Sequence, residues 1–194
     1  PIAGFSPYAF EGDLIVILFL MSVPTLAYYL AGILSIGVYS VLGGSRSLLQ
    51  FFSYEVPLMI VLIGPAVMSG SWSVGEIMRS QTALGPFILF QPLGFLLAIV
   101  GLIGKLKRAP LDIPSAKSEV VGGSLTEFTG AKLALWRLTM NIQAGVGVFL
   151  LVNLYMGWTK LAFNPAVSII VFILECLALV AVLSAASALF SRLR

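Results

Sequence analysis

The chain has 194 residues, of which 59% are hydrophobic and only 10% are charged, with a formal net charge of +3 and a mean hydropathy of +1.06. Soluble domains carry about 25% charged residues, so this composition excludes a water-soluble globular protein and indicates an integral membrane protein. Histidine is absent and Cys176 is the only cysteine, so we expect no catalytic residue, metal site or bound cofactor in this chain.

Five apolar segments are long enough to cross a bilayer, which requires roughly 20 apolar residues per helix. We therefore predict an all-α polytopic membrane bundle that forms a single domain, with the lipid bilayer as a partner and no nucleic-acid partner. Residues 71–83 are too short and too polar to span, and we expect them to lie along the membrane surface. The predicted spans, in chain order, are residues 14–42 (with a kink at Pro24), 46–68, 86–106, 138–158 and 165–190.

The distribution of basic residues predicts the orientation of the bundle. Nine Lys and Arg residues fall on one side of the predicted spans, whereas only Arg79 and Lys160 fall on the other side. Loops rich in Lys and Arg stay in the cytoplasm. We therefore predict a multi-pass protein of the cell membrane whose large loop, residues 105–137, is cytoplasmic.

Two glutamates lie at the predicted depth of the membrane interior. Glu55 and Glu175 each fall near the middle of an apolar span, where a carboxylate costs about 2.5–3.5 kcal/mol. Such residues either handle ions and protons or act as protonated hydrogen-bonding groups between helices. Gln50 and Tyr54 share a helix face with Arg46 and predict a polar path toward Glu55, which lies about 100° around from Tyr54 on a regular α-helix.

The 105–137 loop contains prolines, glycines and spaced acids. Pro110 and Pro114 prevent a regular helix, and Gly122 and Gly123 let the chain turn back between Glu119 and Glu127. Carboxylates beside Arg108 and Lys117 form either a surface network or an ordinary solvated loop.

Two stretches resemble the motifs of one family. "RAPLDIPSAKSEVVGGSLTEFTGAKLALW" (108–136) resembles the loop, and "GGSRSLLQFFSYEV" (43–56) a helix, of the membrane subunit that joins the two arms of respiratory complex I. The family is complex I subunit 1, known as the H subunit in bacteria, with its counterparts in energy-converting membrane-bound hydrogenases, sulfur reductases and formate hydrogenlyase. We expect the chain to match the family's middle five of eight helices, without the first two and the last.

The resemblance implies a docking and coupling subunit without its own redox centre. It implies that cytoplasmic hydrogenase-like large and small iron–sulfur subunits and antiporter-like membrane subunits are partners, with [NiFe] and iron–sulfur centres or quinone elsewhere in the complex. By motif, the docking or quinone-chamber loop comprises Arg108, Asp112, Lys117, Glu119 and Glu127. The ion or charge path that it implies comprises Asp13, Arg46, Gln50, Tyr54, Glu55, Glu119, Glu127 and, from its depth alone, Glu175.

The chain departs from the complex I pattern at several acids. Ser115 and Lys117 stand where complex I has glutamates, Leu125 stands where it often has histidine, and Met140 stands where it has a further glutamate. Arg137 replaces an apolar residue one turn before Met140. The loss of these acids weakens a quinone-linked proton route and favours the hydrogenase and sulfur-reductase relatives.

The leading hypothesis is therefore a membrane anchor and energy-coupling subunit of a hydrogenase-like, ion-translocating complex that moves protons or sodium ions. In this hypothesis, a change of charge at Glu119 and Glu127 is transmitted to Glu55. The alternatives are the quinone-site subunit of complex I, a stand-alone transporter or channel, and a purely structural anchor. The absence of a visible internal repeat argues against the transporter.

Overall fold

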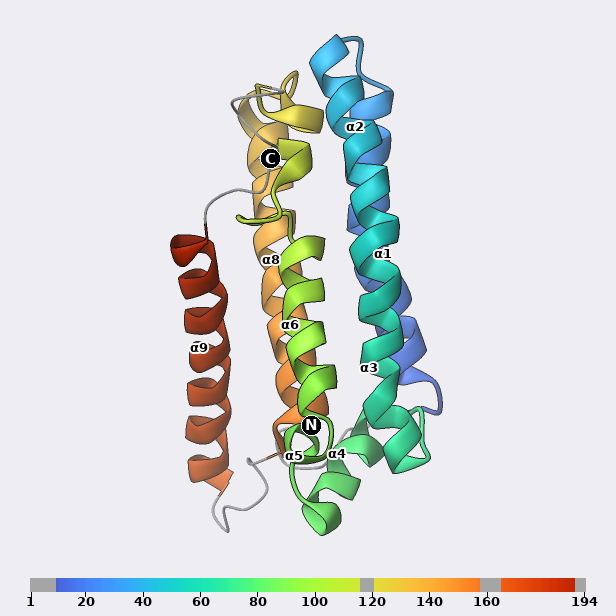
Figure 1. The fold of residues 1–194 in the computed structure, drawn as a ribbon, viewed down its shortest axis with the longest axis vertical. Helices are drawn as coiled ribbons and strands as arrows, with labels where there is room; N and C mark the ends of the chain where they lie inside the picture. Colours follow the sequence, from blue (N-terminus) through green and yellow to red (C-terminus); the bar gives the residue numbers. More distant parts are fainter. Residues whose placement is uncertain (1–9, 116–120, 158–164, 191–194) are drawn as a thin grey trace.

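The computed structural model describes residues 10–115, 121–157 and 165–190, which form an elongated helical bundle (Figure 1). No β-strand occurs in these ranges, and the predicted all-α membrane fold is confirmed. Four helices are long and apolar enough to cross a membrane, and α6 (Pro92–Lys105) is a shorter apolar helix. The four are α1 (Asp13–Ile33), the continuous helix over Val38–Ser69, α8 (Gly130–Tyr155) and α9 (Pro165–Leu189).

Short elements gather at the two ends of the bundle. At one end, which we call the loop end, the α1–α2 connection lies beside the segment that follows α6; α4, α5 and the start of α1 lie at the other end (Figure 1). The remaining elements are α2 (Val38–Gln50), the π-helix η1 (Phe51–Glu55), α3 (Val56–Ser69), α4 (Val74–Leu84), α5 (Phe87–Phe90) and the 3₁₀ turns η2 (Ile113–Ser115) and η3 (Gly123–Leu125).

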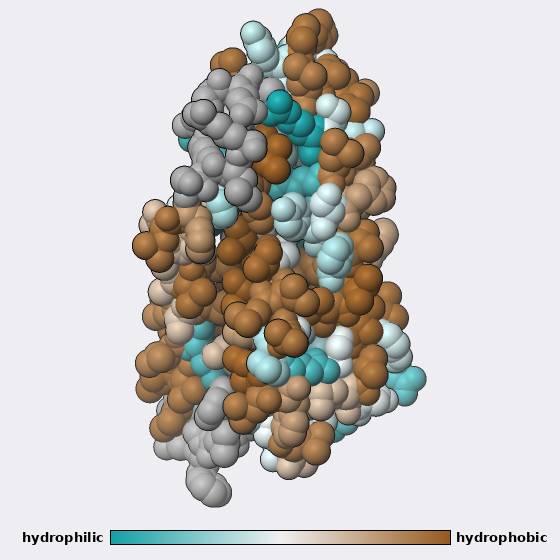
Figure 2. Space-filling view, viewed as in Figure 1, coloured by the Kyte–Doolittle hydropathy of each residue, from teal (hydrophilic) through white to brown (hydrophobic). Residues whose placement is uncertain are grey.

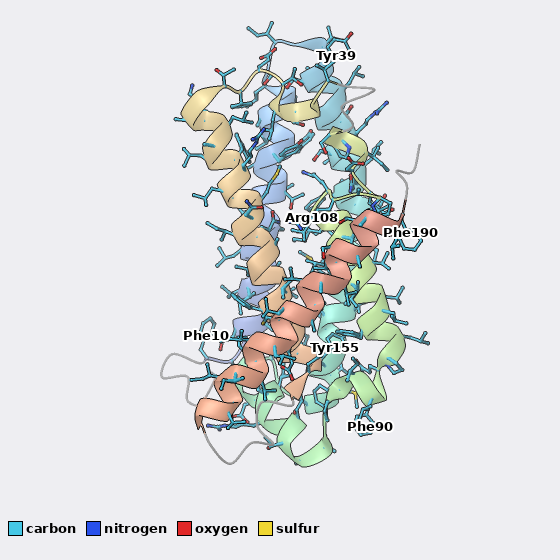
Figure 3. The ribbon with its side chains drawn as sticks, turned by 90° about the vertical axis from the view of Figure 1, so that its left-hand side faces the viewer. Phe10, Tyr39, Phe90, Arg108, Tyr155 and Phe190 are labelled. Atoms are coloured by element: carbon cyan, nitrogen blue, oxygen red, sulfur yellow. The ribbon has the colours of Figure 1, made fainter. Side chains whose placement is uncertain are left out.

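The outer surface of the bundle is largely apolar. Brown, hydrophobic side chains cover most of the face in Figure 2, and polar side chains gather near the loop end and in a lower patch. In Figure 3, Tyr39 stands at the loop end and Phe10 and Phe90 lie toward the other end, while α9 crosses the bundle obliquely. Many large apolar side chains are exposed along the long helices. This surface is suited to lipid, because acyl chains solvate apolar side chains.

The first predicted span differs from the structure at its end. The helix stops at Ile33 instead of continuing to residue 42, residues 34–37 turn the chain, and α2 begins at Val38 rather than at residue 46. The turn sequence Leu-Ser-Ile-Gly is itself mostly apolar, so hydropathy does not separate it from the helices on either side.

The middle of the chain shows two further differences. The span predicted over 86–106 is broken at Gln91, because Pro92 lacks an N–H and restricts the backbone of the residue before it. Helix α8 begins at Gly130, so the last part of the predicted 105–137 loop is helical, and we use the name loop for the connection over residues 106–129. Helix α4 buries Ile77 and Gln81, so this segment packs against the bundle.

A proline inside α3 leaves a carbonyl that another helix satisfies. Pro65 has no N–H to donate to the carbonyl of Val61 four residues earlier. The hydroxyl of Tyr155, a fully buried residue at the end of α8, donates to that carbonyl oxygen at 2.9 Å. This hydrogen bond joins α8 to the middle of α3.

Tyr155→Phe is expected to lower the free energy of unfolding by about 1–3 kcal/mol, because it leaves the Val61 carbonyl unsatisfied in the interior. Thermal unfolding in detergent measures this loss. In a Pro65→Ala background the residue at 65 regains an N–H for that carbonyl, so the same substitution should cost less. An equal cost in both backgrounds would contradict this explanation.

Candidate functional site

The π-helix η1 turns three polar side chains toward the end of α6. On a regular α-helix, residues five apart point about 140° away from each other. The wider turn of η1, with its i→i+5 pairing, brings Glu55 to the same side as Gln50, and both residues are buried. The ring of Tyr54 lies against Gly104 of α6. The prediction of a polar path from Gln50 toward Glu55 assumed a regular helix, whereas the structure has a π-helix between the two residues.

The centre of the site is a buried ion pair. Lys105, the last residue of α6, donates a hydrogen bond from Nζ to Oε1 of Glu55, and the two side chains are 2% and 1% exposed. An isolated charge at this depth is costly, and an opposite charge in contact offsets part of that cost. Oε2 of Glu55 has no hydrogen-bond partner within the described segments. The carboxylate therefore keeps one oxygen free to accept a further proton or hydrogen bond.

Gln50 fastens the helix of Glu55 to both the end of α6 and the loop. Its Nε2 donates to the carbonyl oxygens of Gly104 and Leu111, each at 2.6 Å. The first acceptor directly precedes Lys105, and the second lies in the Arg-Ala-Pro-Leu-Asp stretch of the loop. The position of the ion pair is thus mechanically tied to the position of the loop.

Lys107 occupies a strained position directly after the ion pair. Its N–H bonds the carbonyl of Gly104, and the N–H of Arg108 bonds the carbonyl of Ile103, which is the Schellman pattern that usually places glycine at this site. Lys107 has φ 51°, in the left-handed region, and its Nζ lies 3.4 Å from the centre of the Tyr28 ring. The pKa of the Lys107 ammonium is lowered to about 7, mainly by burial; the charge of Glu55 opposes this decrease and the charge of Lys105 adds to it.

The loop is seated on the α1–α2 hairpin by backbone contact. Gly123 has φ 68°, and a Cβ on it would lie 1.9 Å from the carbonyl oxygen of Pro114. A Cβ on Gly43 of α2 would lie 2.5 Å from the Cα of Gly123. Ser40 Oγ donates to the carbonyl oxygen of Ser124 at 3.0 Å. These contacts hold residues 123–124 directly on α2.

Three other predicted acids do not pair with Lys105 or Glu55 in the described part of the chain. Oε2 of Glu127 accepts from the N–H of Ile36 at 3.3 Å, so this exposed carboxylate holds the α1–α2 turn at the loop end. Asp13 accepts from the N–H of Phe10 at 3.3 Å and lies at the other end of the bundle. Glu175 of α9 is buried, and neither of its carboxylate oxygens has a partner among the described residues.

Three further predicted residues differ in their exposure. Arg108 is exposed, Asp112 is buried and Arg46 is partly buried. Lys117 and Glu119 lie outside the described residues. Figure 3 labels Arg108 beside the upper part of the bundle, close in height to Phe190 at the end of α9.

Comparisons with known proteins agree with the motifs of the loop and of the Glu55 helix. The sequence profile of the NADH dehydrogenase family matches residues 1–194. The chain belongs to this family. Two similar relatives are described as the H subunit of NADH-quinone oxidoreductase: one from Carboxydothermus hydrogenoformans, 31% identical over 79% of this chain and 44% of that protein, and one from Bacillus cytotoxicus, 36% identical over 71% and 45%.

A solved structure provides a second comparison for this family member. A chain of the membrane-bound sulfane sulfur reductase, an archaeal respiratory membrane complex, superimposes with a TM-score of 0.79 at 27% identity, over 95% of this chain and 62% of that one. The expected family, complex I subunit 1 and its relatives, is confirmed. The chain spans less than half the length of the curated relatives that it matches.

Two residues of this candidate site were not predicted from the sequence. Lys105 and Lys107 were counted only as basic residues that set the orientation, yet both turn into the protein near Glu55. A signal existed for the first: Lys105 ends a long apolar run, and a buried glutamate in a neighbouring helix requires a partner. No sequence signal marks Lys107, because its direction depends on the left-handed backbone after α6.

Proposed function

We propose that this chain is the membrane anchor and energy-coupling subunit of a respiratory complex of the hydrogenase and sulfur-reductase type, and that it links redox chemistry in a docked arm to the movement of H⁺ or Na⁺. The observation that carries the proposal is the buried Lys105–Glu55 pair, which Gln50 ties to the loop. The loop end faces the cytoplasm in this proposal, in agreement with the excess of Lys and Arg there.

The pair converts a change at the loop into a change of charge inside the membrane. A buried ammonium and carboxylate in contact exchange a charged form for a neutral one when a single proton moves between them. A shift of the loop backbone at Leu111 acts on Gln50, and Gln50 is hydrogen-bonded to the residue that precedes Lys105. Redox-driven motion of the docked arm therefore changes the balance between the two forms of the pair.

The proposed partners follow from the exposed loop end and from the relatives. Iron–sulfur and hydrogenase-like subunits would dock over residues 106–129, and antiporter-like subunits would lie beside the bundle in the membrane. The redox centres belong to the docked arm in this proposal.

Glu55→Gln is expected to reduce the number of ions moved per electron transferred by the complex, while electron transfer itself continues. The neutral amide cannot take up and release the proton that the carboxylate handles. The measurement is redox-driven ion uptake in inverted membrane vesicles alongside the rate of electron transfer. Glu76→Gln is the matched control, because Glu76 is exposed on α4 and pairs with Arg79. An unchanged ratio of ions to electrons in Glu55→Gln would refute the coupling role.

A second candidate function is the quinone-site subunit of a complex I. The curated relatives are named as a subunit of NADH-quinone oxidoreductase, and this name favours it. The missing acids at Ser115, Lys117 and Met140 favour the sulfur-reductase type. Purification of the intact complex separates the two: co-purified [NiFe]-like or sulfur-reducing subunits support the first, and saturable binding of a quinone analogue supports the second. Ion flux through the isolated chain in liposomes would instead indicate a stand-alone transporter.

A further inference from the structure

A small cavity lies between α1, α8 and the end of α6, directly beside the ion pair. It offers about 10 Å³ of space for a water centre, enough for roughly one water molecule. Such a site requires polar neighbours, and this cavity has them. Its lining includes Lys105 and Lys107 together with Thr25, Tyr28, Trp136 and Gln143.

The two lysines that line the cavity differ in burial and in their partners. Lys105 is buried and paired with Glu55, whereas Lys107 is only partly buried and its Nζ lies over the Tyr28 ring. Lys107 is thus the lysine that reaches both solvent and the cavity. The backbone strain at Lys107 supports a functional role. A lysine at φ 51° has a higher conformational energy than the glycine that usually occupies this position.

The charged and titratable groups around Lys107 are few within the described part of the chain. Helix α6 contributes Lys105, η1 contributes Glu55 and α1 contributes Tyr28. The cavity residues from α8 are Trp136, Thr139, Met140 and Gln143, none of which carries a charge. Within the described residues, Lys107 is therefore a proton-binding group that lies between the loop-end solvent and the Lys105–Glu55 pair.

We propose that Lys107 is the proton-entry group of this site and that it passes protons to the Lys105–Glu55 pair through a water molecule in the cavity. The inference rests on the proposed coupling function and names the residue that feeds it. After the pair has passed a proton onward, it holds a Lys105 amine and a Glu55 carboxylate. The Lys107 ammonium gives one proton to the water, the water gives one to the Lys105 amine, and the Lys107 amine regains a proton from solvent.

Two substitutions separate this role from a structural one. Lys107→Gly removes the amine but suits the left-handed backbone, so the melting temperature should stay equal to that of the wild type or rise. Lys107→Arg keeps a positive charge that does not release its proton. Both variants are expected to slow redox-driven ion uptake in vesicles by about 10-fold or more, as for loss of a proton-transfer group.

The pH dependence provides a readout that packing alone would not change. Ion uptake by the wild type should fall as the pH rises through about 7, where Lys107 loses its proton, and this step should be absent in both variants. If Lys107→Gly takes up ions at the wild-type rate, the proposal is overturned. It is also overturned if Lys107→Arg does so, because a fixed positive charge would then suffice. If Glu55→Gln abolishes coupling while Lys107→Gly does not, only the entry role fails and the coupling function stands.

Discussion

Lys105→Met is expected to lower the free energy of unfolding by about 3–5 kcal/mol, the usual cost of removing one partner from a buried ion pair. The substitution leaves the Glu55 carboxylate 1% exposed without its ammonium partner. Methionine retains most of the volume of the lysine stem, so lost packing contributes little. Unfolding in detergent, followed by helical circular dichroism, measures the loss.

The double variant Lys105→Met with Glu55→Gln distinguishes a charge effect from a packing effect. Removal of both charges eliminates the uncompensated carboxylate, so the double variant should regain a large part of the stability that Lys105→Met loses. If the double variant is as unstable as the sum of the two single variants, the pair is not an energetically coupled unit. This outcome would also weaken the proposed role of the pair in coupling.

Gly123→Ala is expected to destabilise the protein by about 2–5 kcal/mol, because two separate costs add at this residue. A residue with a Cβ at φ 68° costs about 1–2 kcal/mol, and overpacking typically costs about 1–3 kcal/mol. The added methyl group would lie 1.9 Å from the Pro114 carbonyl oxygen, so the backbone must move. Unfolding measurements give the total cost, and limited proteolysis shows whether residues 106–129 detach from α2.

Gly70→Ala is the matched control for this prediction. Gly70 has φ 69°, almost the same as Gly123, but an added Cβ would meet nothing within 4 Å. Its cost should therefore be confined to the backbone strain of about 1–2 kcal/mol, with no change in proteolysis of the loop. Equal effects at Gly70 and Gly123 would show that close packing of the loop on α2 does not matter.

The sequence predicted the all-α membrane bundle because this depends on composition and helix length. It misplaced the end of the first helix, since the turn after Ile33 is as apolar as the helices that it joins. It also missed the break at Gln91, although Pro92 is a recognised signal for a helix boundary. Hydropathy averages over such short interruptions, so it finds spans better than it finds their ends.

The site was less predictable than the fold. Gln50 and Glu55 were identified as polar residues of one helix, but their common direction depends on the π-helix, which no simple periodicity indicates. The partner of Glu55 came from a helix 50 residues further along the chain. Glu127, predicted from its motif as part of a charge path, accepts a hydrogen bond from the α1–α2 turn, and its part in a charge path stays a prediction. The motifs predicted candidate residues, and only the tertiary contacts show which side chains lie beside them.

The π-helix also sets the rotational phase of the long helix over Val38–Ser69. Helix α2 precedes the π-helix, and the close contact of Gly43 with Gly123 determines which face of α2 points toward the loop. Helix α3 follows the π-helix, and the hydrogen bond from Tyr155 to the Val61 carbonyl determines which face of α3 points toward α8. A regular α-helix would carry both halves in one phase and could satisfy only one of these contacts. The extra width of Phe51–Glu55 absorbs the mismatch. Deletion of a single residue there would prevent the loop contact of α2 and the Tyr155 hydrogen bond of α3 from forming at the same time.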